Sequence, residues 1–435
     1  MKALSFLSAG LLAITFLNSM AQHDARTPTQ VLVKTARLLD VRSGKFIENA
    51  AVLIDDDRIK EVGAAVEVQA HAQREAKVID LGHAALLPGL IDCHTHLMAR
   101  FADTPDGYLL GLATKSQAFR ALEGAADARL TLNAGFTTVR DVENEGSGYA
   151  DVALREAINQ GLVEGPRMEV ATRAIAAVGQ YNPFGVSSDL ADFPTGAQMV
   201  SGVDEARRAV REQIGHGADI IKVYADWAHP TLTVDEMHVV VEEAHKAGLK
   251  VAAHATTREG IRNAIDAGVD SIEHGRGADR ELMQEMKDKG VFLVPTVGAI
   301  DEFVEKHKND PMTPEQRKRI DAVLASTYQE IELAKSVGVK IAAGFDPSRE
   351  GRHGKNAEEL AAMVKRGLTP MEAIQAATVN AAELLGWPNR VGSIEAGKFA
   401  DLIAVDGNPL ADITVLEQVK WVMKGGEVVK DEERK

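Results

Sequence analysis

The sequence of 435 residues predicts an α/β fold, a (β/α)8 TIM-like barrel beside a small β-sandwich domain built from both chain ends. Two observations lead to this prediction. The middle of the chain alternates short apolar runs with amphipathic helical stretches, and both ends are β-rich without long helical periodicity. The length agrees with it, because chains beyond about 250 to 300 residues usually divide into more than one module.

The N-terminal segment, residues 1–21, is predicted to be a secretory signal peptide. Lys2 precedes an apolar run over residues 3–17, which is too short to span a bilayer. The small residues Ser19 and Ala21 occupy the two positions that a signal peptidase inspects. Cleavage near Ala21 would deliver the protein to the periplasm or outside the cell, and we expect no membrane partner after cleavage.

Both ends of the mature chain are expected to contribute to the sandwich. Residues 22–85 contain strand-like runs separated by Gly, Asp and charged turns, and residues 388–435 contain similar runs with a Gly425–Gly426 hairpin turn. The sequence therefore predicts a β-sandwich made of these two parts and a barrel over residues 86–387.

Eight strands are expected in the barrel segment, most of them followed by one helix, for example over residues 203–216, 234–246 and 258–267. Short apolar strands of this kind are expected where both faces of a parallel sheet are buried. A doubly wound open sheet is the competing architecture, but the first strand carries no glycine-rich dinucleotide fingerprint. The expected strands are residues 85–96, 137–142, 168–174, 219–225, 250–255, 271–274, 291–296 and 340–345.

Metal-binding side chains occur at the C-terminal ends of these strands, where barrel enzymes place their active sites. In "LLPGLIDCHTHLMA" the alternation of side chains along a strand points His94 and His96 the same way. These histidines with Asp346 would hold one divalent metal ion, and His254 with His274 would hold a second. Imidazole and carboxylate suit zinc, with manganese, cobalt or iron as alternatives.

Lys222 is the unusual member of this set, because it lies in the apolar strand "DIIKVYA". A charged ammonium would be costly to bury there beside two cations. A neutral amine could react with carbon dioxide, and the resulting N6-carboxylysine would be an anion able to bridge both metals. A lysine paired with a neighbouring carboxylate is the alternative.

Composition excludes some partners. Asp and Glu number 64 against 49 Lys and Arg, and the formal net charge of −15 argues against binding to nucleic acids. Cys93 is the single cysteine, so no internal disulfide can form. It alternates with the two histidines of its strand, and we expect it to be buried and to face away from them.

The fragments "IDCHTH", "KVY", "AAHA", "SIEHG" and "AGFDP", in this order, resemble the metal-site motifs of the amidohydrolase superfamily, the binuclear metallohydrolases with a carboxylated lysine. The resemblance covers nearly the whole mature chain, including the closing "GSIEAGKFADLIAVDGNPL". It implies two divalent metal ions, expected to be Zn²⁺, and a homo-oligomer. The ligands that it implies are His94, His96, carboxylated Lys222, His254, His274 and Asp346.

Within the superfamily, "TTVRDV" and "DIIKVYADW" resemble exported prolidase-like or Xaa-Pro dipeptidase-like enzymes and bacterial ochratoxin-degrading amidohydrolases. This implies hydrolysis of N-acyl amino acids or dipeptides with a free C-terminal carboxylate, including conversion of ochratoxin A to ochratoxin alpha and phenylalanine. The alternatives are a cyclic-amide or lactone hydrolase like imidazolonepropionase, and a noncatalytic binding protein. One departure is "AVGQYNPFG", where prolidase-like relatives often have Gly-Gly-His-Gly, so Gln180 or Tyr181 would substitute for that histidine.

Two of the metal-site residues are also expected to be catalytic, Lys222 through its carbamate and Asp346 as general base and then acid. Two cations sharing a water molecule would lower its pKa toward neutrality, and Asp346 would carry the proton to the departing amine. Tyr224, two residues after Lys222, faces the same side of its strand and is a candidate for binding substrate, with core packing as the alternative. His229 and His353 are further candidates on loops.

Two arginines are additional candidates for a substrate carboxylate. Arg140 and Arg173 occur near the second and third expected strands. The sequence does not choose among these cations and histidines, because substrate contacts come from loops that periodicity does not constrain.

Overall fold

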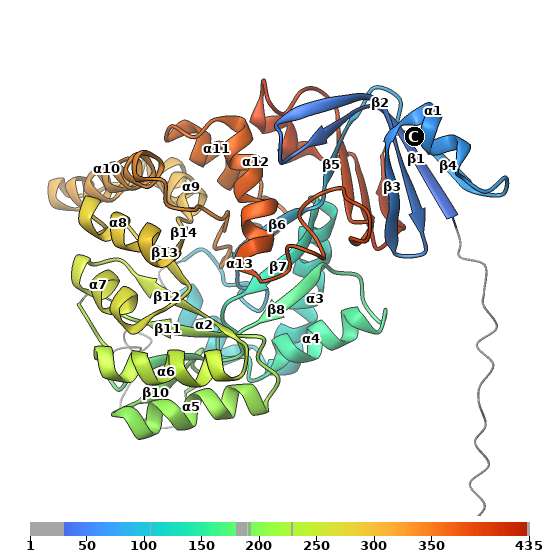
Figure 1. Ribbon diagram of the computed structural model, residues 1–435. Helices are drawn as coiled ribbons and strands as arrows, with labels where there is room; N and C mark the ends of the chain where they lie inside the picture. The colour runs from blue at the N-terminus through green and yellow to red at the C-terminus, as the bar shows by residue number, and fades with distance from the viewer. Residues whose placement is uncertain (1–29, 105, 180–188, 190–192, 228, 433–435) are drawn as a thin grey trace, which may run out of the picture.

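The computed structural model describes residues 30–104, 106–179, 189, 193–227 and 229–432 (Figure 1). The predicted signal peptide lies outside these residues. Among the helices described, none combines the length and the apolar character needed to cross a membrane.

Strands from both flanks of the chain form one sheet of eight strands, which we call the terminal sheet. In Figure 1 its blue and red strands lie side by side. All its described strands belong to this one hydrogen-bonded sheet, so the two-layered sandwich stays a prediction. Its order is β17 (Glu427–Asp431), β16 (Trp421–Lys424), β15 (Leu402–Val405), β5 (Ala85–Pro88), β1 (Gln30–Asp40), β2 (Lys45–Asp55) and β3 (Arg58–Ala64), with β4 (Lys77–Asp80) paired to β1.

The parallel strands of the middle segment form two further sheets, and most of their residues are buried, as expected for strands covered on both faces. The first contains, in order, β6 (Leu90–Thr95), β7 (Phe136–Asp141) and β8 (Arg167–Val170). The second contains β10 (Ala197–Val200), β9 (Ala174–Ala177), β11 (Ile220–Tyr224), β12 (Lys250–Ala255), β13 (Ser271–His274) and β14 (Phe292–Val294).

Backbone hydrogen bonds outside the regular strands connect these two sheets. One bond joins β8 to the start of β11, and a segment over residues 340–343 bonds to β14 on one side and to β6 on the other. The bonds run from the Asp219 amide to the Val170 carbonyl (2.8 Å), from Leu293 to Lys340 (2.9 Å) and from Cys93 to Ala343 (2.8 Å).

The first expected strand, residues 85–96, is divided into β5 and β6, which is a correction to the prediction. The division falls at Gly89, whose amide donates to the carbonyl of Asp401 (2.8 Å). A Cβ atom at Gly89 would lie 2.1 Å from Oγ1 of Thr137, so only glycine fits where the chain leaves the terminal sheet. His94 and His96 therefore follow the beginning of a new strand.

Two other expected strands are also corrected. Residues 168–174 are interrupted after β8 because Thr172 has a φ of 62°, and β9 begins only at Ala174. Residues 340–345 form an isolated bridge between Ile341 and Leu293 rather than a regular strand. The remaining five expected strands are confirmed as β7, β11, β12, β13 and β14, with ends that differ by up to two residues.

The expected helices are confirmed as α5 (Val203–Gly215), α6 (Val234–Lys246) and α7 (Arg258–Ala267), which lie outside the strands in Figure 1. Thr233 and Glu236 form a capping box that begins α6. The other helices are α1 (Ala65–Ala70), α2 (Gly107–Thr114), α3 (Gln117–Asn133), α4 (Ala150–Asn159), α8 (Arg280–Lys289), α9 (Val297–His307), α10 (Pro314–Val337), α11 (Glu358–Lys365), α12 (Pro370–Ala376), α13 (Val379–Leu384) and the 3-10 helix η1 (Ile413–Gln418).

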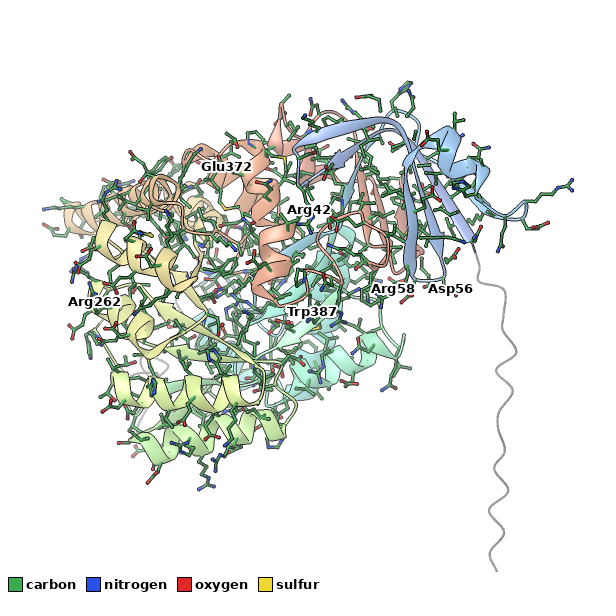
Figure 2. The ribbon with its side chains drawn as sticks, viewed as in Figure 1. Arg42, Asp56, Arg58, Arg262, Glu372 and Trp387 are labelled. Carbon is green, nitrogen blue, oxygen red and sulfur yellow. The ribbon has the colours of Figure 1, made fainter. Side chains whose placement is uncertain are left out.

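A stacked cluster joins the terminal sheet to the middle of the molecule. The guanidinium carbons of Arg58 and Arg167 lie 3.5 and 3.4 Å from the ring centre of Phe399. Arg167, at the start of β8, also forms an ion pair of 2.8 Å with Asp401. Arg58, labelled in Figure 2, belongs to β3, so three segments distant in sequence meet at one aromatic ring.

Candidate metal centre

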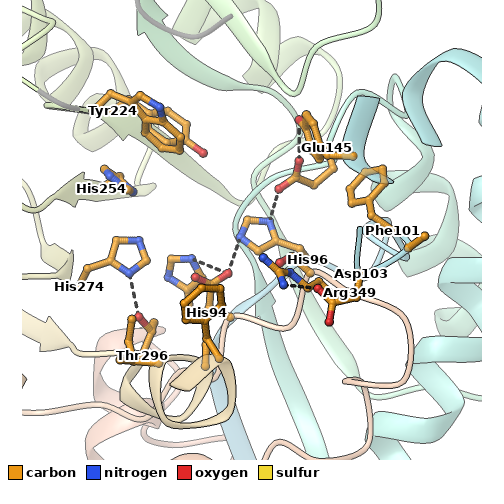
Figure 3. Close-up of a pocket in the computed structure, with 18 of the residues that line it drawn as sticks. His94, His96, Phe101, Asp103, Glu145, Tyr224, His254, His274, Thr296 and Arg349 are labelled. Atoms are coloured by element: carbon orange, nitrogen blue, oxygen red, sulfur yellow. Dashed lines mark hydrogen bonds and ion pairs between the residues drawn. The ribbon is translucent and has the colours of Figure 1, made fainter. Parts of the chain in front are cut away.

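A cavity of about 740 Å³ opens at the C-terminal ends of the parallel strands (Figure 3). Its floor is formed by polar side chains from β6, β11, β12 and β13 and from the segment after residues 340–345. All six side chains predicted as metal ligands line this one cavity: His94, His96, Lys222, His254, His274 and Asp346.

The donor atoms of these residues converge. The ring centres of His94 and His96 lie 5.2 Å apart, and those of His254 and His274 lie 4.6 Å apart. One ligand atom from each of His94, His274 and Asp346 lies within 4.8 Å of the others. Oδ1 of Asp346 is 4.0 Å from Nε2 of His94 and 3.4 Å from Nε2 of His96. These spacings suit donors grouped around cations.

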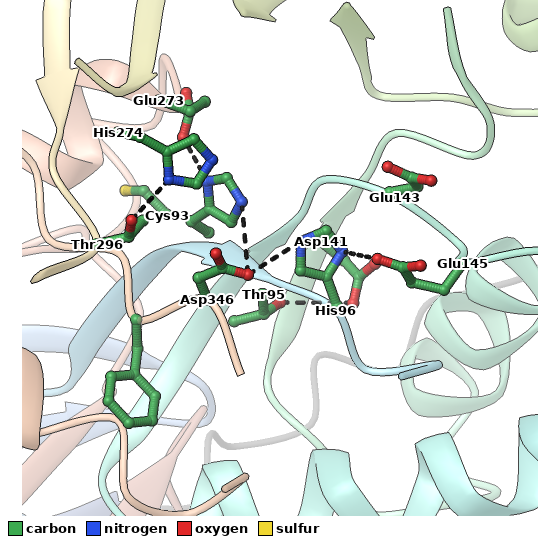
Figure 4. A network of polar contacts seen from close by, with 12 residues as sticks. Cys93, Thr95, His96, Asp141, Glu143, Glu145, Glu273, His274, Thr296 and Asp346 are labelled. Atoms are coloured by element: carbon green, nitrogen blue, oxygen red, sulfur yellow. Dashed lines mark hydrogen bonds and ion pairs between the residues drawn. The ribbon is translucent and has the colours of Figure 1, made fainter. Parts of the chain in front are cut away.

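A buried network holds His94. Its Nδ1 shares a hydrogen bond of 2.7 Å with Glu273, which is labelled in Figure 4. The other carboxylate oxygen of Glu273 accepts from Arg140 (2.8 Å) and from Ser271 (2.5 Å). Arg140 also donates to the carbonyl of Cys93 (2.6 Å), which ties β7 to β6. Because Nδ1 is held by a carboxylate, the imidazole presents Nε2 to the cavity, as in carboxylate–histidine–metal arrangements.

His96 is held from a loop. Its Nδ1 lies 3.2 Å from Glu145, and that carboxylate also accepts a hydrogen bond of 3.1 Å from the hydroxyl of Tyr108. Burial and the neighbouring Glu143 raise the pKa of Glu145 to about 7. Burial opposes protonation of His96, but Asp346 and the two glutamates raise its pKa to about 10 in the metal-free protein.

His274 and His254 occupy the other side of the floor. Nδ1 of His274 shares a hydrogen bond of 2.7 Å with Thr296, and Nε2 of His254 lies 3.8 Å from Asp226. Burial, aided by the charge of Lys222, lowers the pKa of both imidazoles well below the usual range. They are therefore neutral, which is the form that binds metals.

Lys222 is 1% exposed, and burial lowers the pKa of its amine. The carboxylates of Glu273, Glu143 and Asp346 oppose this shift without reversing it. A buried lysine whose charged form is disfavoured, in one cavity with the neutral imidazoles of His254 and His274, fits a carbamate bridge better than a structural ammonium. The donor set as a whole therefore fits two divalent cations.

Asp346 is placed by its backbone as well as by its side chain. Its φ is 57°, and its amide donates to the carbonyl of His94 (2.8 Å). Burial opposes ionisation, but the hydrogen bond with His96 and the charges around it lower the pKa of Asp346 to about 2. Asp92, behind this point, accepts hydrogen bonds from the amides of His94 (2.9 Å) and Phe345 (3.1 Å) and so ties the two segments together.

The predicted substrate contacts separate into two groups. Tyr224 lines the cavity, and its hydroxyl donates a hydrogen bond of 2.5 Å to Glu143. His229 is exposed, and His353 is buried with Nε2 3.4 Å from the carbonyl of Ala99. Neither of these histidines belongs to the cavity wall over the described residues, so their predicted role receives no support from the fold.

The arginines suggested by the sequence are engaged elsewhere. Arg140 serves Glu273 in the buried network, and Arg173 donates to the carbonyl of Ala197 (2.8 Å). Neither contributes to the cavity wall that the structure describes. Gln180 and Tyr181, the suggested substitutes for a histidine, lie outside the described residues.

Several site residues were missed by the sequence interpretation. Glu273 directly precedes His274 in "SIEHG", and a charged residue inside a four-residue buried strand was a signal for it. Glu145 and Arg276 gave no comparable signal because both lie on loops. The cavity also has an aromatic wall, which we define as Phe101, Tyr108 and Phe303.

The comparisons with known proteins cover most of the chain and agree on one family. The model of the amidohydrolase family matches residues 85–429. Ochratoxinase of Aspergillus niger is 33% identical over 458 aligned residues, covering 95% of this chain and 91% of that protein. A solved Xaa-Pro dipeptidase with methionine bound in the active site has a TM-score of 0.82 at 34% identity, covering 92% of this chain and 100% of that one. A prolidase complexed with N-methylphosphonate-L-proline has a TM-score of 0.82 at 31% identity, covering 93% and 100%.

Proposed function

We propose that this chain, which belongs to the amidohydrolase family, hydrolyses N-acyl amino acids or dipeptides with a free C-terminal carboxylate. It is a metal-dependent hydrolase of amide or peptide bonds. The observation that carries this proposal is one cavity whose floor holds six potential metal ligands and whose side is aromatic. The comparisons with ochratoxinase, a Xaa-Pro dipeptidase and a prolidase support it. They do not favour the cyclic-amide or lactone alternative.

The cofactor that we propose is a pair of Zn²⁺ ions, which Lys222, carboxylated to N6-carboxylysine, would help to hold. When bound, two divalent cations polarise a carbonyl group and lower the pKa of a shared water molecule. His94, His96 and Asp346 would hold one ion, and His254 and His274 the other. The neutral state of His254 and His274 and the lowered pKa of Lys222 support this assignment.

Asp346 is proposed to move the proton. Its carboxylate is ionised and lines the cavity beside His94 and His96, so it can accept a proton from water and deliver it to the departing amide nitrogen. Glu273 and Glu145 keep the two imidazoles in place during this transfer. The aromatic wall offers an apolar surface for the acyl group.

Ochratoxin A is a proposed substrate, with ochratoxin alpha and phenylalanine as products. The support is the 33% identity to ochratoxinase over nearly the whole chain, together with the aromatic wall. An aromatic acyl group gains by burial against such a surface, and paired rings contribute roughly 0.5 to 1.5 kcal/mol beyond buried area.

Metal analysis and a substrate panel test the proposed function. Purified protein should contain two divalent ions per chain, lose activity on chelation and regain it when zinc is restored. It should release amine from N-acyl-phenylalanine, Xaa-Pro dipeptides or ochratoxin A, and a cyclic amide serves as the control. Hydrolysis of the cyclic amide alone would contradict the proposal.

Three features of the whole molecule are part of the same proposal. The bonds from Asp219 to Val170 and from Cys93 to Ala343 support a closed (β/α)8 barrel, with the terminal sheet as part of a β-sandwich. Residues 1–21 are proposed to direct export, which N-terminal sequencing of the mature protein would test. A homo-oligomer is proposed as the assembly, and light scattering of the purified protein would measure it.

A further inference from the structure

One arginine lines the cavity beside the second pair of histidines. Arg276 lies two residues after His274, on the loop that follows β13, and it is partly exposed to the cavity. It shares the wall of this cavity with His254 and His274. The guanidinium therefore lines the same cavity in which the scissile bond would be held.

Arg349 and His307, two further cationic side chains of the wall, already have anionic partners. Arg349 forms an ion pair with Asp103, which also pairs with Lys306, and His307 shares a hydrogen bond of 2.7 Å with Asp310. No carboxylate in the described part of the chain lies within ion-pair distance of Arg276. Among the described residues of the wall, Lys222 and Arg276 thus have no ion-pair partner, and Lys222 is assigned to the metal centre, which leaves Arg276 for an incoming anion.

Glu330 is the carboxyl group that most nearly competes for Arg276. It is 1% exposed on α10, and burial raises its pKa well above the usual range although Arg276 opposes this shift. No ion pair or hydrogen bond joins Glu330 to Arg276 in the part of the chain that the structure describes. Neither of its oxygens has a hydrogen-bond partner among the described residues.

Tyr224 is less suited than Arg276 to receive a substrate carboxylate. Its hydroxyl already donates to Glu143 at 2.5 Å, so binding an anion there would break that bond and bring a second negative charge toward Glu143. A guanidinium instead offers planar N–H donors that match both oxygens of a carboxylate.

We propose that Arg276 binds the free carboxylate of the substrate, and this inference rests on the proposed function. The carboxylate of an N-acyl amino acid is separated from the scissile nitrogen by a single carbon. Its receptor must therefore lie next to the metal ligands, as Arg276 lies next to His274. Phe101 lies across the cavity from His254 in Figure 3, so the acyl group would extend toward the aromatic wall.

The test measures how strongly the enzyme prefers a free carboxylate. N-acetyl-phenylalanine and its C-terminal amide, N-acetyl-phenylalaninamide, are compared as substrates of the wild-type protein and of Arg276→Met. The variant should lose about 100-fold in kcat/KM on the acid, chiefly through KM, as expected for a lost hydrogen bond to a charged group. Its kcat/KM on the amide should change little, so the ratio of acid to amide collapses.

Two further variants calibrate this ratio. Arg276→Lys keeps the charge without the planar pair of donors and should restore part of the acid preference. Arg349→Met removes an arginine that lines the same cavity but is paired with Asp103, and it should leave the ratio of acid to amide unchanged. Metal content and the unfolding midpoint of each variant show whether the fold and the centre are intact.

Two outcomes would overturn the inference alone. Equal losses on acid and amide in Arg276→Met would assign the arginine a structural role beside Glu330. Retained acid preference in Arg276→Met, with its collapse in Tyr224→Phe, would make Tyr224 the receptor. If the wild-type protein hydrolyses neither substrate nor any other carboxylate-bearing amide, the proposed function fails and the inference fails with it.

Discussion

His94 on β6 and His96, which directly follows β6, are held in different ways. His94 bonds to Glu273 on β13, and Arg140 on β7 fixes that carboxylate, so its support consists of strands. His96 contacts Glu145 on the loop after β7, and Tyr108 on α2 contacts Glu145 in turn. Strand register fixes the first support, whereas the second depends on the conformation of a loop whose Glu145 has a φ of 53°. We therefore expect the two sides of the centre to respond differently to substitution.

Asp346 lies beside both His94 and His96, and its substitution should have the largest effect on catalytic activity. Asp346→Asn keeps the shape of the side chain but removes the group that accepts and delivers the proton. We expect kcat to fall by about 10²- to 10⁴-fold, the range that general acid–base groups contribute. Bound metal should be retained, and metal analysis beside the rate measurement checks this. Unchanged activity would refute the assignment of Asp346.

Glu273→Gln tests the strand-built support. Arg140 is 1% exposed, and the substitution would leave its charge buried without a carboxylate, so we expect a loss of about 3 to 5 kcal/mol in the free energy of unfolding. Affinity for metal should also fall by about 10- to 100-fold because His94 loses its anchor. Urea unfolding and metal titration measure the two effects. A loss of metal affinity smaller than that of Glu145→Gln would contradict the comparison.

The loss of unfolding free energy in Glu273→Gln should depend on pH and become smaller in acid. Burial opposes ionisation of Glu273, but Arg140 and His94 lower its pKa below the ordinary value of 4.5. The stabilisation by Glu273 is therefore fully present above pH 4.5 and is lost as the pH falls through the depressed pKa. In the metal-free protein, the difference in stability between wild type and Glu273→Gln should shrink in acid.

Glu145→Gln tests the loop-built support and should have a smaller effect. We expect affinity for metal to fall by about 10-fold, the lower end of the range for such partners. The pKa of Glu145 is raised to about 7, so its ionisation destabilises the metal-free fold as the pH rises from 4.5 toward 7. The variant should gain stability relative to wild type over that interval, opposite in sign to Glu273→Gln. Unfolding measured at pH 5 and pH 8 separates the two.

Tyr108→Phe should have the smallest effect. It removes one hydrogen bond of 3.1 Å to Glu145 and leaves His96 in place. The expected change in the free energy of unfolding is about 1 kcal/mol, with a few-fold loss of activity. Tyr328→Phe, on α10 away from the cavity wall, is the matched control. A loss as large as that of Glu273→Gln would show that the loop carries more of the centre than its contacts indicate.

The same contrast explains what the sequence could predict. His94, His254 and His274 lie at the ends of short apolar strands, so alternation and strand order were sufficient to bring them together. Glu145 lies on a loop, and no local periodicity constrains where a loop side chain points. Arg276 is likewise a loop residue. Whether a carboxylate lies near it depends on which distant segments pack around the loop, so its lack of an ion-pair partner in the described structure could not be predicted from the sequence.

The fold prediction failed where backbone geometry overrode an apolar pattern. Thr172, with a φ of 62°, divides an expected strand although its neighbours are apolar, and nothing in the residue type requires that conformation. Residues 340–345 are apolar like a strand but make only one bridge, at Ile341, because the segment turns to place Asp346. Gly89 was the one break with a visible cause in the residue itself.

Gly89 also links the terminal sheet mechanically to the metal centre. It separates β5, which pairs with β15, from β6, which presents His94, and it fits against Thr137 with no room for a methyl group. A slip of β15 against β5 would pull directly on the strand that carries the first ligand. Substitutions in the terminal sheet, far from any reacting atom, should therefore lower catalytic activity before they measurably lower the free energy of unfolding.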